Sequence, residues 1–282
     1  MAAQGGVLLE RDSFMRPPFL GLMSVFLINN LIIPHGVRQI FVFIVVGPEQ
    51  NTCMGKLQQK PAQPYRKTIS PSSLYKGKCA RCTWLSYWHN FSLPANLALQ
   101  SVLSRKQEGF FDEISNAHVD KNLAPGVIKL YKGKKTSVPI KVNGEDSRWA
   151  FYGELDFVIE YEDGRFGVAD GKVSLKADPE ALAKDYFNQL HAYAFMLENP
   201  AEGAAQKVDT LGLVQWKFHE ALPLDAPRWG FSVQHLYIPM ERDDVKFLAF
   251  IEGFINIIEG EFPEPAADCL DCKWLIDNGF QY

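Results

Sequence analysis

Asp156, Asp170 and Lys172 are the residues whose types and spacing are best suited to chemistry. In the segment 149–161, apolar side chains alternate with polar ones, and Asp156 occupies a polar position. This alternation predicts a strand with one buried face. Asp170 and Lys172 lie on the next predicted strand, 165–173, and share a face because they are two residues apart. The sequence therefore predicts charged groups of both signs on one face of a hairpin.

The loop between the two predicted strands decides which side chains meet. A two-residue turn would point Asp170 into the apolar face, where an unpaired carboxylate is costly. A three-residue loop, 162–164, with Gly164 in the left-handed conformation shifts every pair by one residue. We expect this loop because, in its register, apolar side chains lie opposite apolar side chains and a glutamate lies opposite a lysine. The pairs that it predicts are Val158 with Val168, Asp156 with Asp170, and Glu154 with Lys172.

The predicted meeting of Asp156 with Asp170 has a chemical consequence. Two carboxylates in contact repel each other unless they share a proton or a cation. Oxygen ligands suit Mg²⁺ or Mn²⁺ better than Zn²⁺. Lys172 could orient a water molecule beside them or stabilise negative charge that develops on a phosphoryl group. The hairpin is thus a candidate site for metal-assisted hydrolysis, and the alternative is a solvated face of an ordinary amphipathic hairpin.

Four cysteines form a second candidate site, as two Cys-x-x-Cys pairs near the ends of the region 54–282. Two residues between thiolates allow one turn to supply two ligands to a tetrahedral metal ion or to an iron-sulfur cluster. We expect all four to bind one centre that joins the two ends of the fold; the alternative is two unrelated pairs of reduced thiols. The four residues are Cys79, Cys82, Cys269 and Cys272.

Helices and further strands are predicted around the hairpin. Asp178-Pro179 marks a helix start, and the helix should continue to about Glu198. Gln189 and Tyr193 stand four residues apart in its apolar stripe and share a face. Two more helices are expected, one over 95–103 and its flanks and one over 242–258. The expected strands are 208–218 and 229–238, with Pro223 and Pro227 in a loop between them. We therefore expect an α/β fold with a mixed central sheet flanked by helices.

Composition describes an ordinary folded protein with an unusual beginning. The chain has 282 residues, 47% hydrophobic and 22% charged, with a net charge of −4, which excludes coating of nucleic acid by bulk attraction. Residues 1–53 contain two apolar runs, each shorter than the roughly 18–20 residues that span a bilayer. We interpret 1–53 as an extension from a misplaced start codon, with a membrane-associated segment as the alternative. Cys53 lies there without a partner, and paired reduced cysteines favour a cytoplasmic location.

The order of these motifs resembles the RecB-like branch of the PD-(D/E)xK nuclease superfamily, which includes the CRISPR-adaptation exonucleases and the AddB-like nucleases. The resemblance covers roughly 68–282 and extends to the segment 70–74 before the first cysteines. No single motif is specific, but their order and spacing together are much more so. The matching motifs are Gly153-Glu154-Leu155-Asp156, Asp170-Gly171-Lys172 and Gln189-Leu190-His191-Ala192-Tyr193.

This resemblance implies a restriction-endonuclease-like core and a metal-dependent nuclease of the exonuclease type that hydrolyses DNA. Asp156 and Asp170 would bind Mg²⁺ or Mn²⁺, and Lys172 would position the attacking water. Gln189 and Tyr193 would contact DNA or support the site. The substrate would be single- or double-stranded DNA rather than a small molecule, and partner proteins in recombination, repair or CRISPR adaptation are implied. The alternative is an inactive nucleic-acid-binding or structural module on the same fold.

Two features of this chain depart from the family pattern. Related enzymes often use an upstream histidine as a further metal ligand, for which His118 is preferred here over His89. Iron-sulfur members place one cysteine early and three late, whereas this chain has two and two. The resemblance therefore leaves open whether the cysteines bind a [4Fe-4S] cluster or Zn²⁺.

Overall fold

A computed structural model describes residues 58–74, 79–92, 98–131, 133–174, 178–225 and 228–277 of the chain. These residues all belong to one compact unit, Leu57–Gln281. The predicted extension 1–53 and Cys53 lie outside the described residues. Over the described part of the chain, no helix is long and apolar enough to cross a membrane.

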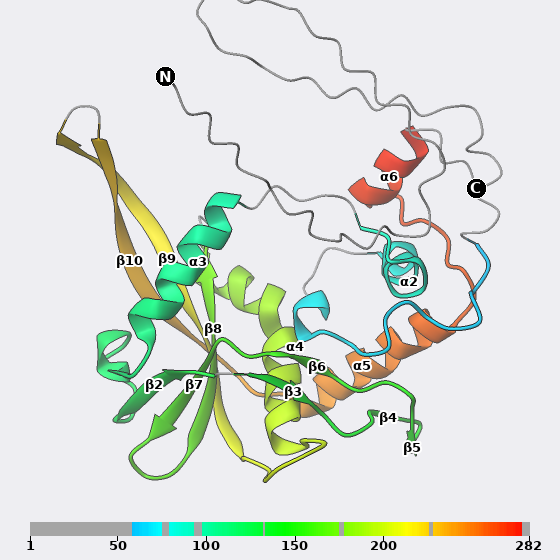
Figure 1. Ribbon diagram of the computed structural model, residues 1–282, viewed down its shortest axis with the longest axis horizontal. Coiled ribbons are helices and arrows are strands. Elements are labelled where there is room, and N and C mark those ends of the chain that lie inside the picture. The colour runs from blue at the N-terminus through cyan, green and yellow to red at the C-terminus, as the bar shows by residue number, and fades with distance from the viewer. Residues whose placement is uncertain are drawn as a thin grey trace, which may run out of the picture. The chain divides into compact units, whose positions relative to one another are not determined.

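The largest sheet is mixed, as the sequence predicted (Figure 1). Its strand order is β1-β2-β7-β8-β9-β10. Strands β8 and β9 run parallel, whereas the other neighbours are antiparallel. The strands are β1 (Ile114–Ser115), β2 (Gly126–Leu130), β7 (Phe157–Tyr161), β8 (Phe166–Val173), β9 (Val208–Asp225) and β10 (Arg228–Met240). The parallel connection from β8 to β9 contains helix α4, Pro179–Glu198.

Helices cover both faces of this sheet. Alternate residues of β8 and β9 belong to two different apolar clusters, since Val168 packs with α4 whereas Ala169 packs with α3, Ala98–Phe111. Asp178 caps α4 and accepts hydrogen bonds from the N–H groups of Glu180 and Ala181, so this helix begins and ends where the sequence predicted. The remaining helices are α2 (Ala80–His89), α5 (Asp244–Glu259) and α6 (Leu270–Asp277), with 3-10 turns η1 (Pro71–Leu74) and η2 (Asn116–His118).

The β7–β8 hairpin has the predicted register. Val158 lies opposite Val168, and the Tyr161 N–H donates to the Arg165 carbonyl oxygen at 3.0 Å. Gly164 has a φ of +83°, the left-handed conformation that the three-residue loop requires. This register carries Asp156 and Asp170 to neighbouring positions.

The predicted strand 149–161 is interrupted, which corrects one predicted pair. Its first half is β6 (Tyr152–Glu154), which pairs with β3 (Lys134–Thr136) in a separate small sheet. Glu154 therefore lies opposite Lys134 rather than Lys172. The interruption switches the buried face, because Leu155 packs in the cluster under α4 whereas Phe157 packs in the cluster under α3. Two more short strands, β4 (Lys141–Val142) and β5 (Glu145–Asp146), follow β3.

The β9–β10 ribbon is longer than predicted. β8 pairs with β9 only as far as Trp216, and beyond that residue β9 pairs with β10 alone. Pro223 lies within β9 opposite Trp229, so the expectation of a loop at this proline was wrong. An outer ribbon strand tolerates proline because the missing N–H is not needed on its unpaired side.

Candidate acidic site and cysteine cluster

Asp156 and Asp170 lie side by side at one end of the hairpin. Asp156 directly precedes β7, and its Oδ2 accepts a hydrogen bond from the Gly171 N–H at 2.9 Å. Asp170 lies within β8 and is only 1% exposed. Phe157 pairs with Ala169, so the hairpin register places Asp156 across from Asp170, and the negative charge of Asp156 contributes to the raised pKa of Asp170. The structure thus brings the two predicted aspartates side by side.

Three further predicted residues surround Asp170. The Gln189 side chain, on α4, donates from Nε2 to Asp170 Oδ1 at 2.8 Å and to the Tyr193 hydroxyl at 3.1 Å. Lys172 forms an ion pair with Asp170 Oδ2. Its ammonium also lies 4.6 Å from the centre of the Tyr186 ring. Every candidate of the sequence analysis on the hairpin and on α4 therefore reaches one cluster.

The charges of this cluster are strongly coupled. Burial raises the pKa of Asp170 to about 7, with a further rise from Asp156 and an opposing effect of the Lys172 ammonium. Burial alone would lower the pKa of Lys172, but Asp170 and Asp156 outweigh it and raise that pKa. Burial and both aspartates also raise the pKa of Tyr193, which keeps its phenol protonated. Asp170 therefore keeps its proton to a higher pH than a free aspartate does, and a bound cation could replace that proton.

Glu108 on α3 is a member of the cluster that the sequence analysis missed. Burial and the charges of Asp156 and Glu154 raise the pKa of Glu108, and Arg105 and Lys172 oppose them. Its neighbour Gln107 is buried and donates to the Val214 carbonyl oxygen at 2.7 Å, which holds this turn of α3 on the sheet. The sequence predicted a helix over 95–103 and its flanks, but nothing in the pattern connected the carboxylate of Glu108 with the hairpin.

The structure does not bring His118 to the acidic cluster. His118 is exposed in η2, where its Nδ1 lies 3.2 Å from the Ser115 carbonyl oxygen. Ser115 pairs with Val127, which in turn pairs with Glu160. Glu160 is four residues along β7 from Asp156, a separation of roughly 13 Å in a strand. As placed, His118 is too distant to share a metal ion with Asp156.

His89, the other histidine considered, also lies elsewhere. It ends α2, where its ring centre is 5.5 Å from that of Trp84. Helix α2 packs against α5 and α6 rather than against the hairpin. The acidic site of the described residues therefore consists of carboxylates, a lysine, an amide and phenols.

The four cysteine thiols meet at a second centre. All four sulfur atoms lie within 4.8 Å of one another, and this group could hold a metal. Sγ of Cys272 is 3.3 Å from Sγ of Cys79 and 3.5 Å from that of Cys82, and Sγ of Cys82 is 3.7 Å from that of Cys269. The expectation that the two pairs converge on one site agrees with this arrangement.

The four cysteines lie at the N-terminal ends of two helices. Cys79 and Cys269 each directly precede a helix, α2 and α6, and their partners occupy the first turns. Burial raises the pKa of Cys79, but N–H groups of Cys82 and Ala266 outweigh it and bring this pKa down to about 7. Burial raises the pKa of Cys272 to about 12. A bound cation would replace these thiol protons, since thiolates are the metal-binding form.

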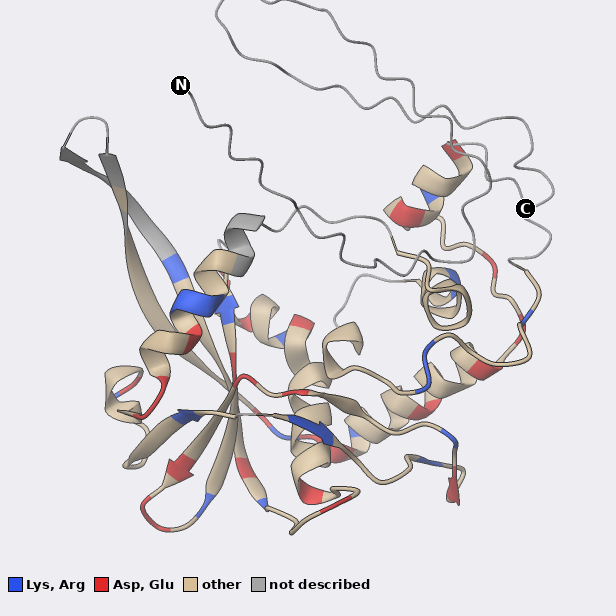
Figure 2. Cartoon of the chain, in the orientation of Figure 1, with Lys and Arg blue, Asp and Glu red and all other residues tan. Residues whose placement is uncertain are grey.

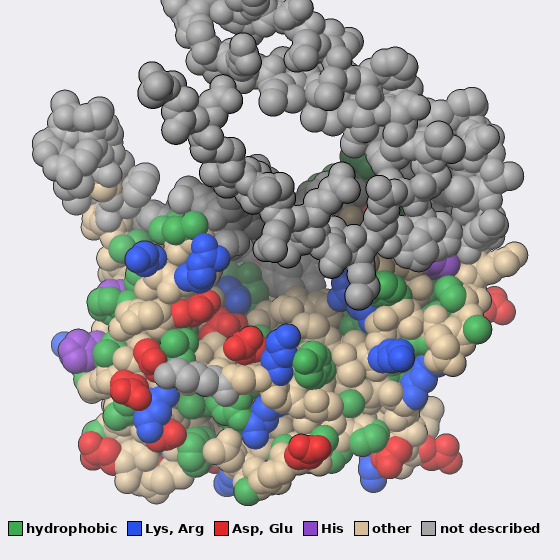
Figure 3. Space-filling view, viewed as in Figure 1, with side chains coloured by type: hydrophobic (Ala, Val, Ile, Leu, Met, Phe, Trp, Pro, Cys, Tyr) green, Lys and Arg blue, Asp and Glu red, His purple; other side chains and the backbone are tan. Residues whose placement is uncertain are grey.

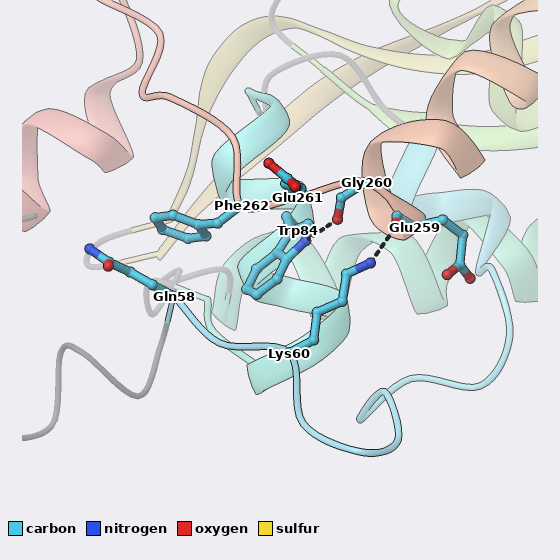
Figure 4. A pocket seen from close by; sticks show the side chains of 7 residues that line it. All are labelled: Gln58, Lys60, Trp84, Glu259, Gly260, Glu261 and Phe262. Carbon is cyan, nitrogen blue, oxygen red and sulfur yellow. Dashed lines mark hydrogen bonds between the residues drawn. The ribbon is translucent and has the colours of Figure 1, made fainter.

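A pocket of about 640 Å³ lies at the C-terminal end of α5 and is separate from the acidic site (Figure 4). The Trp84 indole N–H donates to the Gly260 carbonyl oxygen at 3.2 Å, and Lys60 donates to the Glu259 carbonyl oxygen. These groups satisfy helix-end carbonyls that have no partner within the helix. The pocket walls therefore act as a cap for α5, and none of the predicted site residues lines it.

Comparisons with known proteins add little to this geometry. No protein-family model matches the chain, and no curated protein matches it. Among solved structures, one described as "Crystal structure of SSO0001" is similar over 77% of this chain and 90% of its own. Its sequence identity is 15% and the TM-score is 0.37, which is too low to support an argument.

Proposed function

We propose that the chain is a metal-dependent deoxyribonuclease of the PD-(D/E)xK type. It would be an exonuclease-type enzyme similar to those of the RecB-like branch. The observation that carries the proposal is the position of Asp156 across the hairpin from Asp170, with the ammonium of Lys172 paired to Asp170. Two carboxylates can hold a divalent cation, and a lysine beside them can stabilise the negative charge that develops as a phosphodiester is hydrolysed. The order of sequence motifs supplies the expectation that the phosphodiester belongs to DNA.

The donor set fits Mg²⁺ or Mn²⁺. Asp156 and Asp170 offer carboxylate oxygens, the ligands that these hard cations prefer. The raised pKa of Asp170 reflects burial and the nearby negative charge of Asp156, and a divalent cation would compensate both. When bound, such an ion would polarise the scissile phosphate and lower the pKa of a coordinated water.

The chain's own groups then have distinct tasks. Gln189 orients Asp170 through its hydrogen bond, and Tyr193 in turn accepts from Gln189. Lys172 is placed to stabilise negative charge on the phosphoryl oxygens and to hold the attacking water. Glu108 adds a third carboxylate at the rim of the site and could accept a proton or contribute to cation binding.

The decisive experiment measures cleavage of end-labelled single- and double-stranded DNA with Mn²⁺, Mg²⁺ or EDTA. We expect metal-dependent cleavage that D170A and K172A abolish. Asp163→Ala, in the exposed hairpin loop, is the matched control and should retain activity. Metal-dependent cleavage that D170A leaves intact would refute this site, whereas DNA binding without cleavage would favour an inactive binding module.

At the cysteine centre we propose a single tetrahedral Zn²⁺ ion rather than a [4Fe-4S] cluster. Four thiolates at about 2.3 Å from one ion lie about 3.8 Å from each other. The observed sulfur separations of 3.3, 3.5 and 3.7 Å are close to that value. In a cluster each cysteine binds a different iron, which spaces the sulfurs more widely. Metal analysis of the purified protein tests this: about one zinc per chain supports it, and iron with visible absorbance contradicts it.

A further inference from the structure

The outer face of α3 combines exposed cations with exposed apolar side chains. Val102, Arg105, Lys106, Gly109 and Phe110 recur at three and four residues and therefore share this face. Val102 is 45% exposed and Phe110 is 50% exposed, while Arg105 and Lys106 are also exposed. Figure 2 shows the basic band on α3, and Figure 3 shows basic side chains above a group of acidic ones on this side of the molecule.

This face directly adjoins the acidic site. Gln107 and Phe111 anchor the opposite side of α3 on the sheet. Glu108 follows Gln107, whose Oε1 lies beside Gly171, the residue between Asp170 and Lys172. The charges of Arg105 and Asp156 both influence the pKa of Glu108. A chain lying along the outer face would therefore pass within about one helical turn of Glu108.

The packing beneath Phe110 differs from that of an ordinary core. The Phe110 ring stacks on His235 at 5.5 Å between centres and meets the edge of Trp216 at 6.1 Å. His235 Nδ1 and Trp216 Nε1 are buried here and have no hydrogen-bond partner among the described residues. Buried polar atoms without partners are uncommon in structures selected for stability alone. Phe110 also meets the edge of Phe111 at 4.9 Å but is still half exposed, so it extends this group of rings toward solvent.

Gly109 leaves a flat area between the cations and Phe110. A Cβ at this position would meet no atom within 4 Å, so packing does not require glycine there. Glycine in a helix interior is less favourable than alanine. A close approach of another backbone is one reason to retain it. Gly253 on α5 also has open space around it and provides a matched control.

We propose that the outer face of α3 binds a single-stranded segment of nucleic acid and directs it to the acidic site. An unpaired base would stack on Phe110, and phosphates would contact Arg105 and Lys106. A base in a duplex is already stacked on its neighbours and cannot cover the ring in this way. Because the chain has a net charge of −4, such binding needs a local basic surface of this kind. This inference rests on the proposed nuclease function, for which it specifies the form of the substrate.

The test measures fluorescence anisotropy of labelled oligothymidine and of an equally long duplex with the full-length protein. The buffer contains no added Mg²⁺ or Mn²⁺, which prevents hydrolysis, and no chelator, which would remove a metal from the four cysteines. F110A should weaken single-strand binding about tenfold and leave the salt dependence unchanged, because it removes stacking. R105Q/K106Q should reduce the slope of log K against log salt by about 1.4, since each single-strand phosphate contact contributes about 0.7. G109L should also weaken binding, because its side chain fills the flat area.

Controls on α5 separate this surface from a general effect of mutation. F250A and G253L alter exposed residues of α5 and should leave binding unchanged. Equal losses in F110A and F250A, an unchanged salt slope in R105Q/K106Q, or tighter binding of duplex would each overturn the inference. Hydrolysis of bis(4-nitrophenyl) phosphate with Mn²⁺ distinguishes the two proposals. F110A should retain it, whereas a wild-type protein that binds oligothymidine through Phe110 and hydrolyses nothing would refute only the nuclease.

Discussion

Gln189 donates a hydrogen bond to Oδ1 of Asp170 over 2.8 Å, from the middle of α4 to the middle of β8. Both side chains are buried, so this bond is shielded from water. It leaves Oδ2 of Asp170 directed to Lys172 and fixes the orientation of the carboxyl group. Asparagine at position 170 would retain an oxygen for Gln189 and remove the charge.

Asp170→Asn should change how stability depends on pH. The folded pKa of Asp170, about 7, is above its ordinary value of 3.8, so the unfolded chain releases its proton first as pH rises. The wild-type protein therefore loses stability from this group between about pH 4 and pH 7. Relative to wild type, D170N should gain on the order of 2–3 kcal/mol between pH 5 and pH 8. Urea unfolding at both pH values, without added divalent metal and without a chelator, measures this, and a constant difference would contradict it.

His191 should make the folded protein less stable as pH falls, the opposite of the pH dependence that Asp170 causes. Burial lowers its pKa, and the ring is held as neutral imidazole because Nε2 accepts from the Asp243 N–H at 2.9 Å while Nδ1 faces the Phe187 carbonyl oxygen. A lowered folded pKa means that the unfolded chain binds a proton more readily, so stability falls as pH drops below about 6.5. In the D170N background, H191Q should reduce this acid sensitivity. A pH dependence identical with and without His191 would contradict the prediction.

Glu108→Gln should weaken cation binding more than it weakens folding. Glu108 adds negative charge beside Asp156, so its neutralisation should raise the Mn²⁺ concentration for half-maximal cleavage about 10- to 100-fold. Glu113→Gln, an exposed carboxylate following the same helix, is the control and should have little effect. Titration of activity with Mn²⁺ measures both variants. If E108Q and the wild-type protein required the same Mn²⁺ concentration for half-maximal cleavage, Glu108 would not contribute to the cation site.

Cys272→Ser should destabilise the fold itself. Cys272 is buried with the other three sulfurs, and the loss of one of four thiolate ligands weakens a structural metal site that contributes directly to folding. We expect the melting temperature to fall by several degrees, and a chelator to lower that of wild type but to change C272S much less. C53S is the control and should match wild type. Chelator-insensitive melting of the wild-type protein would refute a structural metal.

Local sequence signals predicted the parts of the fold that local chemistry determines. Gly164 favoured a three-residue loop, which set the hairpin register, and Asp178 before Pro179 marked the start of α4. Gln189 and Tyr193 followed from helical periodicity, and their meeting with Asp170 depended only on α4 crossing β8. These features require little knowledge of contacts between distant segments.

Other features depended on contacts that no local pattern reveals. Leu155 and Phe157 are both apolar and two residues apart, so the sequence could not show that they pack in different clusters. The resulting break moved Glu154 to Lys134. Glu108 joins the site only because α3 lies across the sheet, and its spacing from Asp156 in the sequence gives no hint of this.

The cysteine cluster also has a consequence for the order of folding during synthesis. Cys79 and Cys272 are separated by 193 positions, and the sheet and most helices lie between them. At about 5–20 residues per second, a ribosome needs roughly 10–40 s to make that segment. Until then Cys79 and Cys82 lack the other two thiols of the cluster. Assembly of the four-cysteine cluster must therefore be a late event, which occurs after the strands that carry Asp156 and Asp170 have already left the ribosome.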